Sequence, residues 1–167
     1  MASVLVAYAT KYGSTREVAE AVATRLRSHG LEVVTTPAGD VRDVSGHSAV
    51  VLGTALYFFM WRGEAHRFLR RNRKALPDLP VAVFGLGPIE DTPEQFAGAR
   101  QHLDKGLAKH PWLQPRAVAV FGGRLEPASL RFPDNNPAVR AMLAVDLRDS
   151  GGIEAWADSL VGALGLG

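Results

Sequence analysis

The chain has 167 residues, a length that suits one domain with a core large enough to be stable without disulfides or structural metals. It contains no cysteine, which excludes disulfide bonds, thiolate zinc sites, iron–sulfur clusters and a cysteine nucleophile. The formal net charge is +2 and charged residues make up 22%, so the overall charge does not indicate a nucleic-acid-binding protein. Any redox chemistry therefore depends on a bound cofactor.

A strand, a polar loop and the start of a helix follow one another in the stretch Ser3–Glu20. The apolar run Val4–Ala7 is typical of a strand buried on both faces, and Ser14–Glu17 matches the S-x-x-E capping box of a helix. Unpaired backbone N–H groups at a helix N-terminus and the hydroxyls of the loop together favour an anion, most naturally a phosphate. The alternative is that Ser14 and Glu17 only cap the helix. The predicted phosphate contacts are Thr10, Lys11, Tyr12, Gly13, Ser14 and Thr15.

Four more short apolar runs predict strands, and the amphipathic stretches between them predict helices. The further strands are expected at 31–36, 48–53, 80–84 and 117–121. The helices are expected at about 14–29, at about 61–75, from Thr92 to a point before Pro111, and from about Gly152 onward. Uniformly apolar strands that alternate with helices indicate an α/β protein whose parallel sheet lies between two helical layers. We therefore predict a flavodoxin-like three-layer sandwich, with a five-stranded parallel sheet in the order 2-1-3-4-5 and helices on both faces.

The regular pattern loosens at about 124–150, which we expect to be an irregular excursion within a single domain of residues 1–167. Three prolines interrupt this segment, and Asn136–Pro137 begins at most a short helix. The segment is mostly polar and includes Asp134, Asp146 and Asp149. The N-terminus carries no basic leader, and no stretch approaches the roughly 18 uncharged residues that a membrane span requires. We therefore expect a cytoplasmic protein without a transmembrane segment.

Ligands of such parallel sheets bind beyond the carboxyl ends of the strands. The loops after the first, third and fourth strands are therefore expected to converge on one crevice. The motifs of dinucleotide and nucleoside-triphosphate sites are absent, and Ala9-Thr10 and Gly53-Thr54 stand where a phosphoreceiver domain needs carboxylates. A mononucleotide with a terminal phosphate and a flat apolar ring fits what remains, and FMN meets both conditions.

The FMN ring is expected to lie between the two later loops, where backbone amides approach its edge and aromatic side chains cover its faces. The alternative for the aromatic residues Tyr57, Phe58, Phe59 and Trp61 is an apolar plug packed on a neighbouring helix. The predicted ring contacts are Thr54, Ala55, Leu56, Tyr57, Phe58, Gly85, Leu86, Gly87 and Pro88.

Two stretches carry a resemblance to a known family, ATKYGSTREVA at 9–19 and LGTALYFFMWRGEAHRFL at 52–69. Over nearly its whole length the chain resembles the flavodoxin-like family, in particular the flavodoxin-domain group that contains the menaquinone-dependent protoporphyrinogen oxidase of bacterial haem synthesis. This resemblance implies FMN as the cofactor, with Thr10–Thr15 matching the phosphate loop. The chain departs from the family in placing Tyr12 at the middle hydroxyl of the T-x-T-G-x-T loop, in its slightly basic charge and in the polar 124–150 segment.

These observations predict an FMN-binding flavoprotein that works as an oxidoreductase or an electron-transfer protein. The alternatives are a protoporphyrinogen oxidase with a quinone acceptor and a flavin-free binding module on the same fold. No catalytic residue is identified. The histidines show no metal-ligand spacing, so no metal site is predicted and they are expected to be surface or cap residues: His29, His47, His66, His102 and His110. The alternative for His66, on the helix after the ring loop, is an approach to the substrate.

The predicted helix at 61–75 is strongly cationic between Arg62 and Lys74. Guanidinium groups pair well with carboxylates, so this helix favours an acidic redox partner or the propionates of a porphyrin. The alternative is a solvated face with cations near the helix C-terminus. A small molecule or a quinone is the expected substrate in the crevice, and no nucleic-acid partner is expected.

Overall fold

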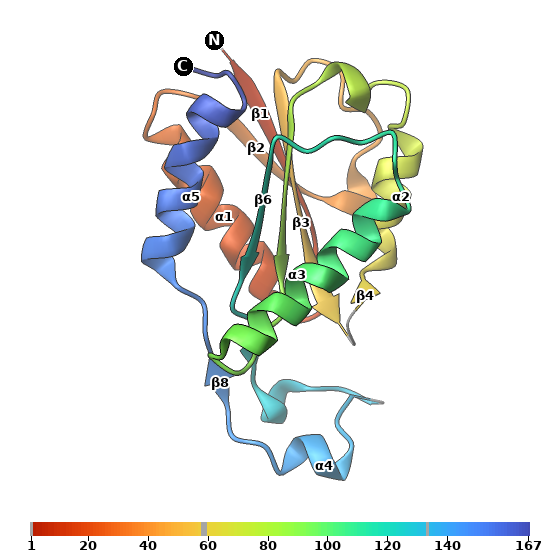
Figure 1. Ribbon diagram of the computed structural model, residues 1–167, viewed down its shortest axis with the longest axis vertical. Helices are drawn as coiled ribbons and strands as arrows, with labels where there is room; N and C mark the ends of the chain where they lie inside the picture. The colour runs from red at the N-terminus through yellow and green to blue at the C-terminus, as the bar shows by residue number, and fades with distance from the viewer. Residues whose placement is uncertain (1, 58–59, 133) are drawn as a thin grey trace.

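Five parallel strands form the centre of the computed structural model, which describes residues 2–57, 60–132 and 134–167 (Figure 1). The strands are β1 (Ser3–Ala9), β2 (Glu32–Pro37), β3 (Ala49–Tyr57), β5 (Val81–Leu86) and β6 (Ala117–Phe121). They lie in the order β2-β1-β3-β5-β6, and every neighbouring pair is parallel. Strand β4 lies off this path. When the five parallel strands are numbered 1 to 5 along the chain, their order is 2-1-3-4-5, which confirms the predicted topology.

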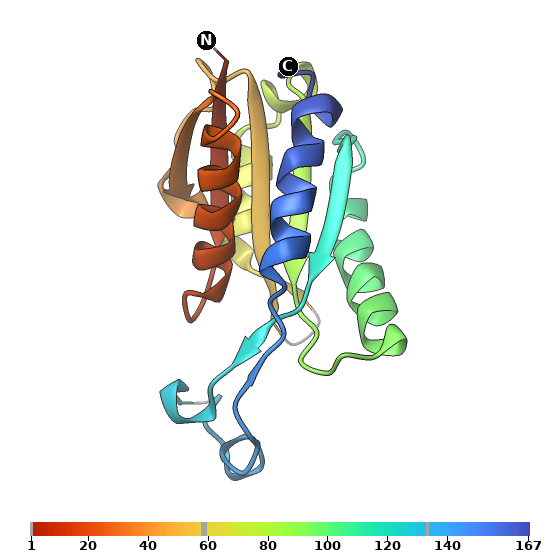
Figure 2. The ribbon, with the colours of Figure 1, turned by 90° about the vertical axis from the view of Figure 1, so that its left-hand side faces the viewer.

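Two helical layers cover the sheet, as Figure 2 shows from the side. They consist of α1 (Ser14–Arg27) and α5 (Ser150–Ala163) on one face, and α2 (Gly63–Arg71) and α3 (Pro93–Ala108) on the other. Alternate side chains of β1 enter different cores: Val4 and Val6 pack in the core with α1 and α5, whereas Leu5 and Ala7 pack in the core with α2 and α3. Burial on both faces explains why the inner strands β1, β3 and β5 are largely apolar in the sequence. In the described ranges no helix is long and apolar enough to cross a membrane.

Strand β3 is longer than the sequence predicts and turns back in a hairpin. It continues to Tyr57, and its last residues pair antiparallel with β4 (Met60–Trp61). The prediction that a loop begins at Thr54 is therefore wrong over residues 54–57. Because Leu56 pairs with Trp61 in the hairpin, Trp61 belongs to a strand, and α2 begins two residues later than expected.

The N-terminus of α1 differs from the predicted capping box. Gly13 is the N-cap residue, with a φ angle of 93°, and no side chain caps the helix. Ser14 is the first helical residue, and the Glu17 carboxylate accepts a hydrogen bond from Arg148 instead of reaching back to the cap. The capping-box prediction is wrong because an arginine 131 positions away takes up the carboxylate.

Helix α3 begins as predicted, and α2 ends earlier than predicted. The Thr92 hydroxyl accepts a hydrogen bond from the backbone N–H of Gln95, at 3.2 Å, and caps α3. Helix α2 ends at Arg71, where the side-chain amide of Asn72 donates to the Phe68 carbonyl at 2.9 Å. Single turns of 3-10 helix, η1 (Ala38–Asp40) and η2 (Leu76–Asp78), lie in the connections after β2 and α2.

Residues 124–149, called the lobe below, project beyond the carboxyl ends of the strands (Figures 1 and 2). The lobe leaves β6 through Gly122, where a Cβ atom would lie 2.2 Å from the Leu147 carbonyl oxygen, so only glycine lets the returning chain pass this closely. Asn136 caps a short helix by accepting from the Val139 N–H at 3.0 Å, as its sequence predicts. The lobe contains the antiparallel pair β7 (Arg124–Leu125) and β8 (Val145–Asp146), η3 (Pro127–Ser129) and α4 (Pro137–Arg140).

Candidate functional site

A cavity of about 470 Å³ lies at the carboxyl ends of β1, β3 and β5. The loop between β1 and α1 forms one end, the β3 and β5 ends form its middle, and α3 and the lobe form the remaining walls. The cavity therefore joins a polar strand-to-helix loop to a more apolar slot. The predicted site residues that line it are Thr10, Lys11, Tyr12, Ser14, Ala55, Leu56, Leu86, Gly87 and Pro88.

The other predicted site residues do not line the cavity or lie outside the described part. Gly13 and Thr15 belong to the start of α1, and Gly85 is buried within β5. Thr54 is fully buried, and its hydroxyl accepts from the Arg62 N–H at 3.2 Å inside the β3–β4 hairpin. Phe58 lies outside the described residues, and only the backbone of Tyr57 is described.

The loop from Thr10 to Ser14 is shaped by a local hydrogen bond and one left-handed residue. The Thr10 hydroxyl oxygen accepts from the Gly13 N–H at 2.9 Å. The positive φ of Gly13 is a conformation that an L side chain adopts only with strain. The turn brings the strand end directly to the N-terminus of α1, whose first N–H groups have no partner within the helix.

Thr15 provides the clearest sign that this loop can bind a ligand. Its side chain is fully buried, yet its hydroxyl oxygen has no hydrogen-bond partner among the described residues. A buried hydroxyl without a partner costs free energy, so native proteins nearly always satisfy it. Thr15 stands in the first turn of α1 beside Ser14, which lines the cavity. The residues present therefore fit an anionic group held at this helix end.

Tyr12 is bound to the lobe by a buried carboxylate. Its hydroxyl donates to Asp134, which is 3% exposed, and the Lys11 ammonium lies 2.5 Å from the same carboxylate oxygen. The Arg131 N–H donates to the Tyr12 hydroxyl at 3.3 Å, and the Arg131 guanidinium lies 5.7 Å from the centre of the Tyr12 ring. These contacts tie the lobe to the predicted phosphate loop.

Sequence reasoning missed Asp134, because it lies 122 positions from Tyr12. The signal that could have found it is Tyr12 itself, a phenol at a position where the family motif has a small hydroxyl.

Glycine backbones at Gly85 and Gly87 allow the Leu56 side chain to lie close to β5 beside the slot. A Cβ atom on Gly85 would lie 3.1 Å from the Leu56 side chain, and one on Gly87 would lie 3.2 Å from it. Both distances are shorter than ordinary van der Waals contact. The sequence did not predict the opposite walls, which are formed by Ile89, Glu90, Glu94, Gln95, Gly98, Ala99 and His102 before and on α3, and by Gly123, Arg124, Leu125, Glu126, Ser129, Leu130, Asp134, Val139 and Met142 at the lobe.

Two histidines that the sequence places 44 positions apart form a pair outside the cavity. His66 Nδ1 lies 2.8 Å from His110 Nε2, and the His66 ring stacks on Trp61 with ring centres 4.9 Å apart. Burial, followed by the charges of His110, Lys109 and Arg70, lowers the pKa of His66 to about 4. The expectation that these histidines are ordinary surface or cap residues is wrong for this pair. In the part of the chain that the structure describes, no three His, Cys, Asp or Glu side chains could hold a metal ion.

A parallel sheet with a polar strand-to-helix loop and an apolar slot at the carboxyl ends of its strands defines a flavodoxin-like α/β protein. The flavodoxin domain family matches residues 5–139. The chain therefore belongs to the flavodoxin domain family, and this membership indicates FMN as the cofactor.

Known proteins similar to this chain include a dehydrogenase and several flavodoxins. Protoporphyrinogen IX dehydrogenase [quinone] of Escherichia coli K12 is 21% identical over 151 residues, which cover 89% of this chain and 80% of the relative. A short-chain flavodoxin associated with a non-canonical PDU bacterial microcompartment has a TM-score of 0.62 at 20% identity, over 98% of this chain and 99% of that one. Flavodoxin 2 from Bacillus cereus has a TM-score of 0.62 at 18% identity, over 96% and 99%. At these identities the solved structures support the fold.

Proposed function

We propose that the cavity binds FMN and that the protein works as an oxidoreductase or an electron-transfer protein. The observation that supports this most strongly is the buried, unpaired hydroxyl of Thr15 beside a cavity that leads from a polar loop to an apolar slot. A ligand that suits this site carries a group that hydrogen-bonds to the hydroxyl and an apolar part that fills the slot. FMN has both, and its ring supplies the electron chemistry when bound.

Different residues of the chain would hold the phosphate and the ring of this cofactor. Thr10, Ser14 and Thr15, with the N–H groups at the start of α1, would hold the phosphate by hydrogen bonds and by the positive end of the helix dipole. Leu56 and the Leu86–Pro88 backbone would hold the ring and keep water from one side of it. The Tyr12 hydroxyl donates a hydrogen bond to Asp134, so we assign Tyr12 to holding the lobe and not to binding the phosphate.

The visible spectrum of the purified protein, recorded before and after adding FMN and removing the excess, tests this proposal. We expect a yellow protein with the absorption bands of bound flavin and a melting temperature that rises with FMN concentration. A colourless protein that takes up no FMN and gains no thermal stability would contradict the proposal and favour a flavin-free binding module.

Protoporphyrinogen oxidation with a quinone acceptor is the second candidate function. It is favoured by the similarity to the Escherichia coli dehydrogenase and by the extension of the cavity to Leu125, Leu130, Val139 and Met142, which give it apolar walls. Anaerobic turnover of protoporphyrinogen with menaquinone tests it. We expect oxidation to depend on both the quinone and bound FMN. An FMN-loaded protein that leaves the porphyrinogen unchanged would restrict the proposal to electron transfer with another partner.

A further inference from the structure

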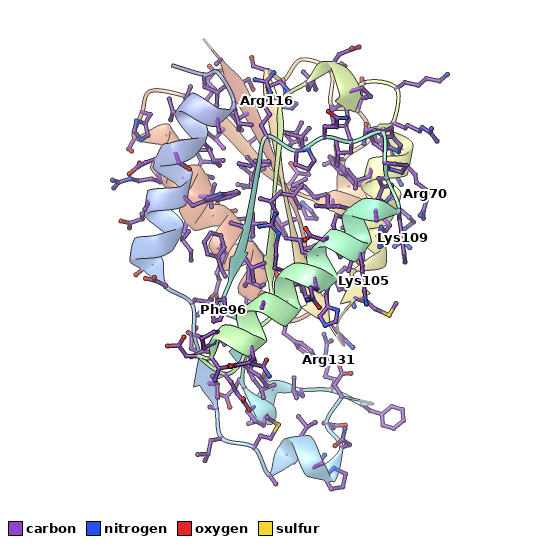
Figure 3. All side chains as sticks on the ribbon, in the orientation of Figure 1. Arg70, Phe96, Lys105, Lys109, Arg116 and Arg131 are labelled. Carbon is purple, nitrogen blue, oxygen red and sulfur yellow. The ribbon has the colours of Figure 1, made fainter. Side chains whose placement is uncertain are left out.

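A row of cations runs along α3 from the edge of the cavity. His102 lines the cavity, and Lys105 and Lys109 follow it three and seven positions later, so all three share one side of the helix. Arg70 of α2 and Lys109 both lie close enough to the His66–His110 pair to lower the pKa of each ring. Arg131 continues the row at the lobe end, as Figure 3 shows. Arg70, Lys105, Lys109 and Arg131 are called the basic strip below.

The cations of the basic strip differ from two arginines near them, Arg62 and Arg100, in their carboxylate contacts. In the described ranges, no ion pair is formed by Arg70, Lys105, Lys109 or Arg131. By contrast, Arg62 pairs with Glu64 at 3.2 Å, and Arg100 pairs with Asp104 at 3.0 Å. Part of the positive charge predicted for residues 62–74 is therefore neutralised within the fold, by Glu64. Arg70 of this face lies at the border between α2 and α3, close to Lys109.

The basic strip lies where a protein could reach the cofactor cavity. Its lower end, Arg131, packs over Tyr12, which lines the cavity. Beside α3, Trp61 donates to the Leu103 carbonyl at 3.2 Å, and the neighbouring Met60 is 64% exposed. Arginine and methionine are enriched at protein interfaces.

We propose that the basic strip docks an acidic protein that exchanges electrons with the cofactor in the cavity. The proposal rests on the proposed function, since it names the partner class for the same site. Lysines and arginines without carboxylate partners attract an acidic protein surface, raise its rate of association and orient it on the strip. Salt screens this attraction and shortens the distance over which it acts. The edge of the cavity between α3 and the lobe is then the path by which electrons enter or leave.

The test uses a plant-type [2Fe–2S] ferredoxin, a small acidic electron carrier, as the probe. Each reduced ferredoxin gives up one electron, and FMN takes up two electrons with protons from water, so loss of the yellow colour reports the rate. We expect the second-order rate to fall about tenfold between about 20 and 300 mM salt. At low salt, Arg70→Glu, Lys105→Glu and Lys109→Glu should each reduce the rate about threefold or more.

Arg116→Glu is the matched control, because it makes the same charge change on an exposed residue at the opposite end of the sheet (Figure 3). It should alter the rate less than about 1.5-fold. Electron-transfer rates that do not change with salt concentration would overturn the proposal. So would an equal loss of rate in the Arg116 and Lys109 variants, or the absence of any reaction with FMN-loaded protein.

Calorimetric binding of oxidised ferredoxin to the flavin-free protein separates the two proposals. Binding that weakens with salt and in Lys109→Glu, but not in Arg116→Glu, would support the docking surface even if the protein takes up no FMN. Absence of binding in this experiment, with normal FMN uptake, would overturn the docking surface and leave the cofactor proposal intact.

Discussion

The Thr15 hydroxyl distinguishes a residue that serves the fold from one that serves a ligand. A threonine in the first turn of a helix is ordinary, but this one is fully buried and unpaired within the described part of the chain. The unliganded protein therefore bears a desolvation cost at this hydroxyl, and a bound phosphate would remove it. Removal of the Thr15 hydroxyl should therefore lower the affinity for the ligand and leave the stability of the unliganded protein unchanged or slightly higher.

Thr15→Val should weaken FMN binding while leaving the unliganded fold intact or slightly more stable. A hydrogen bond to a charged group is worth about 1.5 to 3 kcal/mol, so we expect the dissociation constant to rise about tenfold or more. Fluorescence titration with FMN and thermal melts of the apoprotein measure the two effects. Thr24→Val, an exposed change on the same helix, is the control and should leave the dissociation constant unchanged. Equal affinities for wild type and Thr15→Val would exclude the hydroxyl from the site.

His66 should make stability fall in mildly acidic solution. The unfolded chain takes up a proton near the ordinary histidine pKa of 6.5, whereas the folded ring does so only near 4. Between these values the unfolded state binds more protons than the folded state. The contribution of His66 to the free energy of unfolding is therefore highest above pH 6.5 and decreases as the pH drops toward 4. We expect a loss of about 1 to 2 kcal/mol, after allowance for partial exposure of the ring.

Chemical denaturation at several pH values checks this dependence. The His66→Gln variant should lose most of the decline between pH 6.5 and 4, whereas His47→Gln, a change outside the pair, should retain it. An unchanged pH profile in the His66 variant would show that other groups cause the decline.

At the scale of elements, the hairpin of β3 and β4 is held by contacts with α3 that the sequence pattern does not reveal. Trp61 packs where Gly106 leaves no side chain: a Cβ atom there would lie 2.0 Å from the indole nitrogen. The same indole donates to the Leu103 carbonyl. Gly106 therefore serves close packing between helix and hairpin, although glycine has low helix propensity.

Gly106→Ala and Gly98→Ala should have opposite effects on stability, although both lie in α3. At Gly106 the methyl group displaces Trp61, and we expect a loss of about 2 kcal/mol or more. At Gly98 nothing lies within 4 Å of the added atom, so better helix propensity should stabilise by about 0.5 to 1 kcal/mol. Urea denaturation of both variants measures the difference. A Gly106→Ala protein as stable as the wild type would show that the hairpin adjusts freely.

At the scale of the whole molecule, a three-layer body carries a lobe that is attached at few points. Tyr12 and Asp134 join the lobe to the predicted phosphate loop, and Arg148, where the lobe rejoins α5, contacts Glu17 of α1. The lobe adds no residue to the two main cores. Its position therefore depends on a small number of polar contacts, of which the buried Asp134 carboxylate is central.

Asp134→Ala should release the lobe without unfolding the sheet. Loss of a buried, charge-assisted contact of about 1.5 to 3 kcal/mol should make tryptic cleavage at Arg131 or Arg140 about tenfold faster. Mass spectrometry of a digestion time course locates the cuts. Asp149→Ala, at the junction of the lobe and α5, is the control and should be cleaved at the wild-type rate. Equal cleavage of both variants would mean that Asp134 does not hold the lobe.

The sequence was sufficient for the sheet order, the helical layers and the strand-to-helix loop at Thr10–Ser14, because these depend on local periodicity and on rules of parallel sheets. It was misleading at the start of α1 and at the end of β3, where Arg148 and Trp61 supply partners that are not adjacent in sequence.

Only the tertiary structure revealed the Tyr12–Asp134 contact, the His66–His110 pair and the basic strip. Each joins side chains from elements whose spacing along the chain carries no pattern. The physical reason is that burial and charge depend on distance in space. Local periodicity reports which face of an element is apolar, whereas which buried polar groups meet, and which charges remain unpaired, is decided when the elements pack together.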